Sequence, residues 1–313
     1  MADGKAKVTR TVLTFPALTG MRYPRLEASE VLREVAGPDE VASLPWPDRQ
    51  AIRVLMTSAT RGCSAAMVEA LPALGLVVSQ GVGLDKIDTG ALAARGIRLR
   101  SVGEAATDDV ADLAMALTQM LCRGLVRADV FARSGAWTQG RFEVGDSLVG
   151  MTMGIAGLSG RIGQAIAARA RVSRMKIAGL DRASNRGQDA VLCHSWADLA
   201  RASDVLVLAV PGSDDLTHVV DADVLSALGP KGRLVNVGRG SLVDTAALVT
   251  ALEQNAIAGA ALDVLEGEPQ VPARLAALPN VVLTPHIGAQ TWGQRARGAE
   301  IAETEVLAYL AKV

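Results

Sequence analysis

The sequence has few aromatic residues and almost no excess of either charge. Phenylalanine, tryptophan and tyrosine together make up 3% of the 313 residues, and the formal net charge is −1 at pH 7. Single-stranded nucleic acids are bound through aromatic stacking and basic grooves, and anionic membranes attract basic segments. The composition therefore argues against nucleic acid and membrane surfaces as partners.

Cysteines and long apolar runs are also scarce. Cys63, Cys122 and Cys193 are odd in number and widely spaced, which predicts neither a disulfide framework nor a metal site. No uncharged apolar stretch reaches the roughly 18 residues of a membrane-spanning helix. The charged start "MADGKAKVTR" is not followed by the apolar core of a signal peptide. We expect free thiols, no bound metal and a cytoplasmic protein.

Short β-rich apolar runs alternate with helical patterns along the chain. Several runs are apolar almost throughout, which is typical of parallel strands covered on both faces. The alternation predicts a doubly wound α/β architecture. The candidate strands are residues 10–15, 52–57, 76–79 and 97–100, followed by 153–156, 176–180, 204–210, 233–237, 259–264 and 280–284.

A long helical pattern at 107–131 separates four of these strands from six. It begins with Thr107 as a predicted cap and with acids in its first turn, which suit a helix N-terminus. Six strands make one complete dinucleotide-binding sheet, and the last helix, about 291–311, is expected to return to the first domain. The predicted domains are residues 1–103 with 287–313, and residues 104–286.

A glycine-rich loop follows the strand at 153–156. It reads G-x-x-G-x-x-G at Gly157, Gly160 and Gly163, one residue longer than the usual G-x-G-x-x-G. A helical pattern follows, and a helix start offers unpaired amides and a positive dipole end to a pyrophosphate. The first two glycines would admit the phosphate to the backbone, and Gly163 would let the helix pack on its strand. We assign the surplus residue to Ser159.

Asp181 distinguishes a cofactor loop from an ordinary glycine-rich turn. It ends the next strand, 18 residues after Gly163, where dinucleotide-binding folds place an acid on the adenosine ribose. A carboxylate at this place repels a 2′-phosphate and so favours NAD, whereas Arg182 and Arg186 could attract that phosphate. NAD is the predicted cofactor, with NADP as the alternative.

Polar side chains follow three later strands in succession. Arg239 stands between two glycines, Glu266 and Glu268 lie in the loop after Asp263, and His286 follows the last strand. Taken singly, each could be a surface or structural residue, but parallel strands end at one edge, where such folds bind ligands. An arginine fork binds a carboxylate. A carboxylate beside an imidazole orients it and raises its pKa, which gives a proton donor near neutral pH.

Five segments carry a more specific signal: "GVGLDKID" (81–88), "TDDVADLA" (107–114), "LVNVGRGSLVD" (234–244), "AGAALDVLEGEP" (258–269) and "NVVLTPHIGA" (280–289). In these segments the sequence resembles the D-isomer-specific 2-hydroxyacid dehydrogenases, and it is most similar to their glyoxylate/hydroxypyruvate reductase branch. The resemblance implies a Rossmann cofactor domain inserted in a flavodoxin-like substrate domain. It also implies a homodimer that uses the helix at 107–131.

The resemblance implies a role for each candidate residue. Arg239 would bind the substrate carboxylate, His286 would be the acid/base and Glu268 its partner. The backbone amides of Val82 and Gly83 would hold the carboxylate from the other domain. The predicted cofactor-binding residues are Thr107, Gly157, Leu158, Ser159, Gly160, Arg161, Ile162, Gly163, Asp181, Arg182, Val210, Pro211, Val237, Gly238, Asp263 (at the nicotinamide carboxamide) and Gly288.

The predicted reaction is hydride transfer from NAD(P)H to a small 2-keto acid, glyoxylate or hydroxypyruvate, which yields the D-2-hydroxy acid. A phosphoglycerate-type or other D-2-hydroxyacid dehydrogenase is one alternative. A non-catalytic regulatory module that binds NAD(H) is another, from a different functional class.

Overall fold

The computed structural model describes residues 11–16, 20–29 and 31–313. The chain divides into two compact units. The first contains the described residues up to Ala106 together with Ala289–Val313, and the second is Thr107–Gly288. The domain boundaries predicted from the sequence fall after residues 103 and 286.

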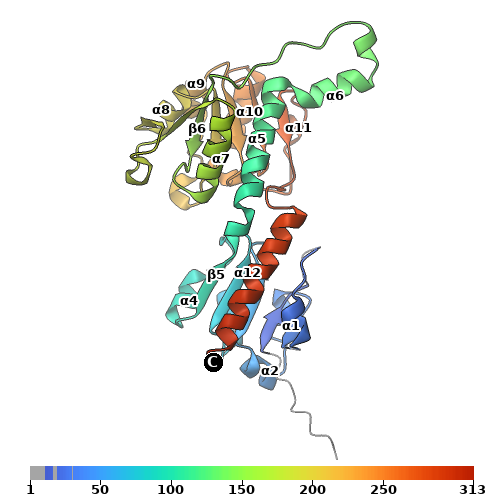
Figure 1. The fold of residues 1–313 in the computed structure, drawn as a ribbon, viewed down its shortest axis with the longest axis vertical. Coiled ribbons are helices and arrows are strands. Elements are labelled where there is room, and N and C mark those ends of the chain that lie inside the picture. The colour runs from blue at the N-terminus through green and yellow to red at the C-terminus, as the bar shows by residue number, and fades with distance from the viewer. Residues whose placement is uncertain (1–10, 17–19, 30) are drawn as a thin grey trace, which may run out of the picture. The chain divides into compact units, whose positions relative to one another are not determined.

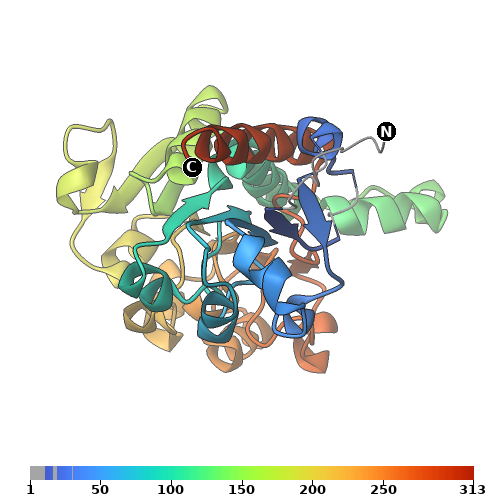
Figure 2. The same ribbon diagram turned by 90° about the horizontal axis from the view of Figure 1, so that it is seen from below.

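The first unit is built on a parallel sheet with the strand order β2-β1-β3-β4-β5, the order of flavodoxin-like folds. Alternate residues of β1, β3 and β4 enter different cores, so that Val12 packs on the α12 side and Leu13 on the α3 side. Figure 2 shows α12, in red, crossing one face of this sheet. The elements are β1 Val12–Thr14, α1 Pro24–Ala28, β2 Leu32–Glu34, α2 Trp46–Ala51, β3 Val54–Ser58, α3 Ala65–Ala70, β4 Leu76–Gln80, α4 Thr89–Ala94, β5 Arg98–Ser101 and α12 Trp292–Leu310.

The second unit is a parallel sheet with the strand order β12-β11-β10-β9-β6-β7-β8. The strand order reverses between β6 and β9, and open α/β sheets bind ligands at such a switch point. The elements are α5 Thr107–Arg123, α6 Leu125–Arg133, β6 Thr152–Ala156, α7 Arg161–Val172, β7 Lys176–Leu180, β8 Val191–Cys193, α8 Trp196–Arg201, β9 Val205–Leu208, α9 Ala222–Leu228, β10 Arg233–Asn236, α10 Thr245–Glu253, β11 Gly259–Leu262, α11 Ala273–Ala276 and β12 Val281–Leu283.

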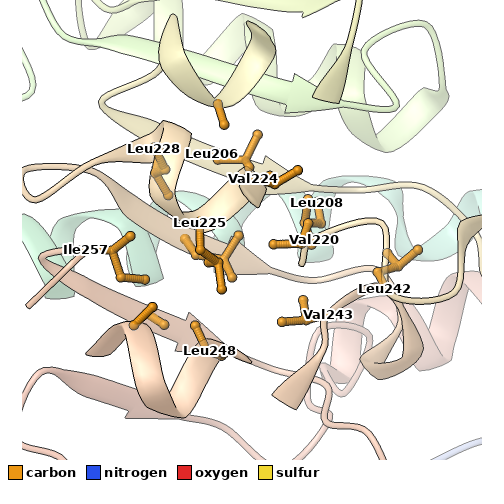
Figure 3. Packing of buried hydrophobic residues seen from close by; sticks show 14 of the residues in the cluster. Leu206, Leu208, Val220, Val224, Leu225, Leu228, Leu242, Val243, Leu248 and Ile257 are labelled. Atoms are coloured by element: carbon orange, nitrogen blue, oxygen red, sulfur yellow. The ribbon is translucent and has the colours of Figure 1, made fainter. Parts of the chain in front are cut away.

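Aliphatic side chains fill the space between this sheet and helices α8, α9 and α10. Leu206 and Leu208 of β9 meet Val224 and Leu225 of α9, and all four are at most 5% exposed (Figure 3). The predicted doubly wound α/β architecture, with a Rossmann-type sheet and a flavodoxin-like sheet, is confirmed. Within the part of the chain that the structure describes, no helix is long and apolar enough to cross a membrane.

Two of the edge strands, β2 and β8, are not predicted from the sequence. Each is three residues long, and an edge strand has only one hydrogen-bonded neighbour. β2 has the sequence LRE, and Val191 of β8 is 59% exposed. β2 carries two charged residues in three and so lacks an apolar run, whereas β8 (VLC) is an apolar run as short as β12, an edge strand that is predicted from the sequence.

The single helix predicted at 107–131 is wrong. It is broken at Gly124, whose φ of 58° is left-handed, and α6 begins directly afterwards. A glycine after a basic residue is a common helix stop, so Gly124 was a signal in the sequence. The predicted cap is also wrong, because Thr107 is the first residue of α5 and its hydroxyl has no hydrogen-bond partner among the described residues.

The N-terminus of α1 depends on a carboxylate from α12. Glu303, which is 4% exposed, accepts hydrogen bonds from the backbone amides of Arg25 (2.8 Å) and Leu26 (3.1 Å). Replacing Glu303 by Ala leaves these amides without their acceptor, so we expect the free energy of unfolding to fall by about 2 kcal/mol. Urea denaturation followed by circular dichroism measures this. Glu300→Ala, on an exposed position of the same helix, is the control, and equal midpoints for both variants would contradict the prediction.

Candidate active site

The glycine-rich loop after β6 forms a close-packed turn. Gly157 has a left-handed φ of 92°, and a Cβ atom there would lie 2.6 Å from the carbonyl oxygen of Ala209. A Cβ atom on Gly163 would lie 2.0 Å from the carbonyl oxygen of Gly157. Both positions therefore require glycine, and the start of α7 lies directly against the loop.

The start of α7 offers amide donors. Gly160 is the N-cap residue and supplies no side-chain cap, and the first bond of the helical ladder runs from the Gln164 amide to the Gly160 carbonyl, at 2.9 Å. The amides of Arg161, Ile162 and Gly163 precede this bond and have no helical acceptor. Together with the positive dipole end they form a place for a phosphate group. The loop therefore fits a dinucleotide pyrophosphate despite its extra residue.

The surplus residue Ser159 contacts the next loop along the sheet edge. Its Oγ accepts a hydrogen bond of 2.9 Å from Oγ of Ser184, which lies in the turn after β7. Its neighbour Leu158 is fully buried and packs against Gly179, where a Cβ atom would lie 2.7 Å from the Leu158 side chain. The insertion is thus accommodated by a buried leucine and a hydroxyl contact.

Asp181 follows β7 and lies between two basic side chains. Oδ1 accepts a hydrogen bond of 3.1 Å from Nε of Arg186, and Oδ2 lies 3.7 Å from Nδ1 of His194. The hydrogen bond from Arg186 is the largest cause that lowers the pKa of Asp181. Arg182 is exposed beside them. The acid predicted to favour NAD is present, and its charge is partly compensated.

Other predicted cofactor residues lie at the start of α5 and in the turns after β9 and β10. Thr107 carries a buried hydroxyl that has no hydrogen-bond partner within the described residues, a group that a polar ligand atom would satisfy. Gly238 lies against the backbone of the β9 loop, with its Cβ position 2.7 Å from the Val210 carbonyl oxygen. Val237 is buried beside it, and Pro211 is exposed.

Arg239 is positioned by the turn after β10. The side-chain amide of Asn236 donates to the Arg239 carbonyl at 2.8 Å, and its oxygen accepts from the Gly238 amide at 3.0 Å. Asn236 is fully buried, so this turn is fixed from inside the sheet. The guanidinium donates through Nη1 to the carbonyl of Gly238 at 2.7 Å and is half-buried.

His286 and Glu268 form a hydrogen-bonded pair. Nδ1 of His286 lies 2.7 Å from Oε1 of Glu268, and the two side chains are 53% and 41% exposed. The second carboxylate oxygen of Glu268 accepts from the Leu265 amide at 3.2 Å. Both residues are predicted from the sequence, and the structure brings them together.

Asp263 holds the backbone around His286. It is 3% exposed, and its carboxylate accepts hydrogen bonds from Thr284 Oγ1 (2.7 Å), the Ile287 amide (2.8 Å) and the Gly288 amide (2.9 Å). Both carboxylate oxygens of Asp263 therefore accept hydrogen bonds within the second unit, and these contacts position the loop that carries His286. The contact of Asp263 with the nicotinamide carboxamide stays a prediction.

Val82 and Gly83 belong to the first unit and follow β4. Val82 is 39% exposed, and Gly83 is buried. Gly103 lies against Val82, because a Cβ atom there would be 2.9 Å from the Val82 Cα. Within the described residues, neither the Val82 nor the Gly83 amide donates a hydrogen bond.

One feature of the site was not found from sequence. Nε2 of His218 lies 2.6 Å from Oε1 of Glu266, two residues before Glu268. His218 follows β9 in a segment without periodic pattern, and its position beside Glu266 depends on sheet order. The sequence does carry a signal for this pair, because His218 is a second histidine in a loop that follows the carboxyl end of a predicted strand.

Comparisons with known proteins agree with this geometry. The D-isomer specific 2-hydroxyacid dehydrogenase NAD-binding domain matches residues 115–288. The chain is 44% identical to glyoxylate/hydroxypyruvate reductase A of Arabidopsis thaliana over 78% of this chain and 77% of the relative. It is 36% identical to 2-ketogluconate reductase of Gluconobacter oxydans over 95% and 94% of the two chains.

A solved structure of similar fold holds a cofactor. The NADPH-dependent glyoxylate/hydroxypyruvate reductase of Sinorhizobium meliloti, in complex with NADP and malonate, superposes with a TM-score of 0.84 at 37% identity, covering 96% of this chain and 94% of that one. Sequence, sheet order and site geometry thus lead to one assignment: the chain belongs to the D-isomer specific 2-hydroxyacid dehydrogenase family.

Proposed function

We propose that this protein is an oxidoreductase that transfers a hydride from NAD(P)H to the keto carbon of glyoxylate, hydroxypyruvate or a similar small 2-keto acid, yielding the D-2-hydroxy acid. The hydrogen-bonded pair of His286 and Glu268, on the sheet edge that also carries Arg239 and the glycine loop, is the observation that carries the proposal. Relatives named as glyoxylate or hydroxypyruvate reductases support the substrate class.

Each residue of the pair has a chemical task. When bound, NAD(P)H supplies the hydride. His286 is held by Glu268 through Nδ1, which leaves proton transfer to the substrate oxygen to Nε2. The Glu268 carboxylate stabilises the imidazolium before the transfer. Arg239 binds the substrate carboxylate and stabilises negative charge that develops on the keto oxygen.

The remaining roles follow from the loops. We assign cofactor binding to the predicted domain 104–286 and substrate binding to residues 1–103 with 287–313, where the Val82 and Gly83 amides are proposed carboxylate donors. Thr107, Asp181 and the residues of the glycine loop are proposed cofactor contacts. All three cysteines are buried and unpaired, which supports the expected cytoplasmic location.

His286→Ala tests the proposed reaction. The parent protein should oxidise NADH or NADPH in the presence of glyoxylate, hydroxypyruvate or pyruvate. The fall in absorbance of the reduced cofactor measures this reaction. The variant should lose about a thousandfold in kcat because the proton donor is gone, while the Kd of the cofactor stays within about twofold. An unchanged kcat would remove the acid/base assignment. A parent protein that binds NADH but reduces no 2-keto acid would instead favour the regulatory module.

The compensated charge on Asp181 predicts weak discrimination between the two cofactors. Asp181→Ser removes the carboxylate that repels a 2′-phosphate and should shift the ratio of kcat/KM by about tenfold toward NADPH. Arg186→Gln removes a cation and frees the carboxylate, so it should shift the ratio toward NADH by a similar factor. Steady-state kinetics with both cofactors measures the ratio, and shifts of the same sign in the two variants would refute this assignment.

We also propose a homodimer formed through residues 125–149, the segment that begins with α6. Figure 1 shows α6 leaving the end of α5 and extending away from the sheet of the second unit. Its exposed apolar side chains would be poorly placed in water and suit a second copy of this chain. They are Leu125 (45%), Val126 (47%), Val130 (61%), Trp137 (71%), Val144 (99%) and Val149 (53%).

Light scattering after size-exclusion chromatography tests the dimer. The parent chain should elute with twice its mass of 32.5 kDa. Replacing both Val130 and Trp137 by Lys should give a monomer, because the charges would have to be buried between the copies. Val172→Lys, at an 86% exposed position on α7, should leave the dimer intact. A monomeric parent chain would exclude the proposal.

A further inference from the structure

A second histidine–carboxylate pair lies next to the catalytic pair. Nε2 of His218 is 2.6 Å from Oε1 of Glu266, and the two side chains are 42% and 41% exposed. Glu266 and Glu268 are separated only by Gly267, which has a φ of 73°. One short turn thus presents a carboxylate to each of two histidines, and His218 and His286 both have left-handed backbone, with φ of 55° and 54°.

His218 is also tied to the turn that carries Arg239. Its amide donates to the carbonyl of Ser241 at 2.8 Å. Gly240 lies against the Glu266 turn, since a Cβ atom there would be 2.0 Å from the carbonyl carbon of Leu265. The loops after β9, β10 and β11 are therefore joined around the His218–Glu266 pair.

The charges of this pair depend on pH. The hydrogen bond to Glu266, with a smaller contribution from Asp244, raises the pKa of His218. The hydrogen bond from His218, followed by hydrogen bonds from Thr245, lowers the pKa of Glu266. The two charges attract each other fully at pH values above the lowered pKa of Glu266 and below the ordinary pKa of histidine, and this attraction is lost as the pH rises through the raised pKa of His218.

We propose that His218 is a positioning residue, which through Glu266 sets the place of Arg239 relative to the Glu268–His286 pair. Neither His218 nor Glu266 is assigned a contact with substrate. The inference rests on the proposed function, because positioning matters only if Arg239 binds a carboxylate. It makes the substrate affinity of the enzyme depend on the ionisation of His218.

Two substitutions of His218 separate its charge from its backbone conformation. His218→Asn gives a neutral side chain that tolerates left-handed backbone, and His218→Arg keeps a positive charge at every pH. At pH 6 we expect His218→Asn to raise the KM of glyoxylate and the Kd of oxalate (a carboxylate probe, measured with NADH bound) by about tenfold. The Kd of NADH should stay within about twofold.

The dependence on pH distinguishes positioning from general loss of structure. In the parent enzyme the Kd of oxalate should rise as the pH passes the raised pKa of His218. This rise should be absent in His218→Arg, which should bind oxalate as the parent does at pH 6. Glu253→Gln, which breaks the similarly exposed ion pair with Arg274, is the control and should match the parent enzyme throughout.

Each outcome decides the proposal. The proposal would be overturned if His218→Asn bound oxalate with the Kd of the parent, or if the Kd of oxalate depended on pH in His218→Arg as it does in the parent. Turnover of glyoxylate by the parent would still uphold the proposed function in either case. A parent chain that neither binds oxalate nor reduces a 2-keto acid would contradict both.

Discussion

The site depends on the hydrogen bonds that the buried carboxylate of Asp263 accepts from the loop around His286. Left-handed backbone is unfavourable for a histidine by about 1 kcal/mol or more, yet His286 adopts it. Three hydrogen bonds to the Asp263 carboxylate and one from the His286 amide to the Asp263 carbonyl hold the loop in that form. Because the conformation is held from inside the sheet, the imidazole is directed to Glu268 before any ligand arrives.

Sheet order explains why the other groups lie near this loop. β10, β11 and β12 are adjacent and parallel, so the turns that carry Arg239, Glu268 and His286 emerge side by side. The glycine loop follows β6, at the reversal of strand order. A reaction that needs a carboxylate anchor, a proton donor and a dinucleotide can therefore be assembled on one rigid edge, with precision that comes from backbone contacts such as those of Asn236.

The features predicted well from sequence are those with a local physical signature. The central strands are apolar because both faces are covered, and the polar residues after them share an edge for topological reasons. The edge strand β2, with two charged residues in three, lacks that signature, and the break at Gly124 was missed because the apolar spacing continues across it. The contacts of Asp263 and His218 could not be predicted, since each depends on which loop lies beside which after the sheet has formed.

The extra residue in the glycine loop shows the limit of arguments from spacing. The loop is one residue longer than the usual G-x-G-x-x-G motif. A pyrophosphate, however, needs amides directed toward it and a backbone that it can approach closely, and both conditions are met around Gly157 and Gly163. The insertion instead places a hydroxyl at Ser159, bonded to Ser184 in the turn that also contains Asp181 and Arg186. The longer loop thus links the turn proposed to bind phosphate to the turn proposed to bind the ribose.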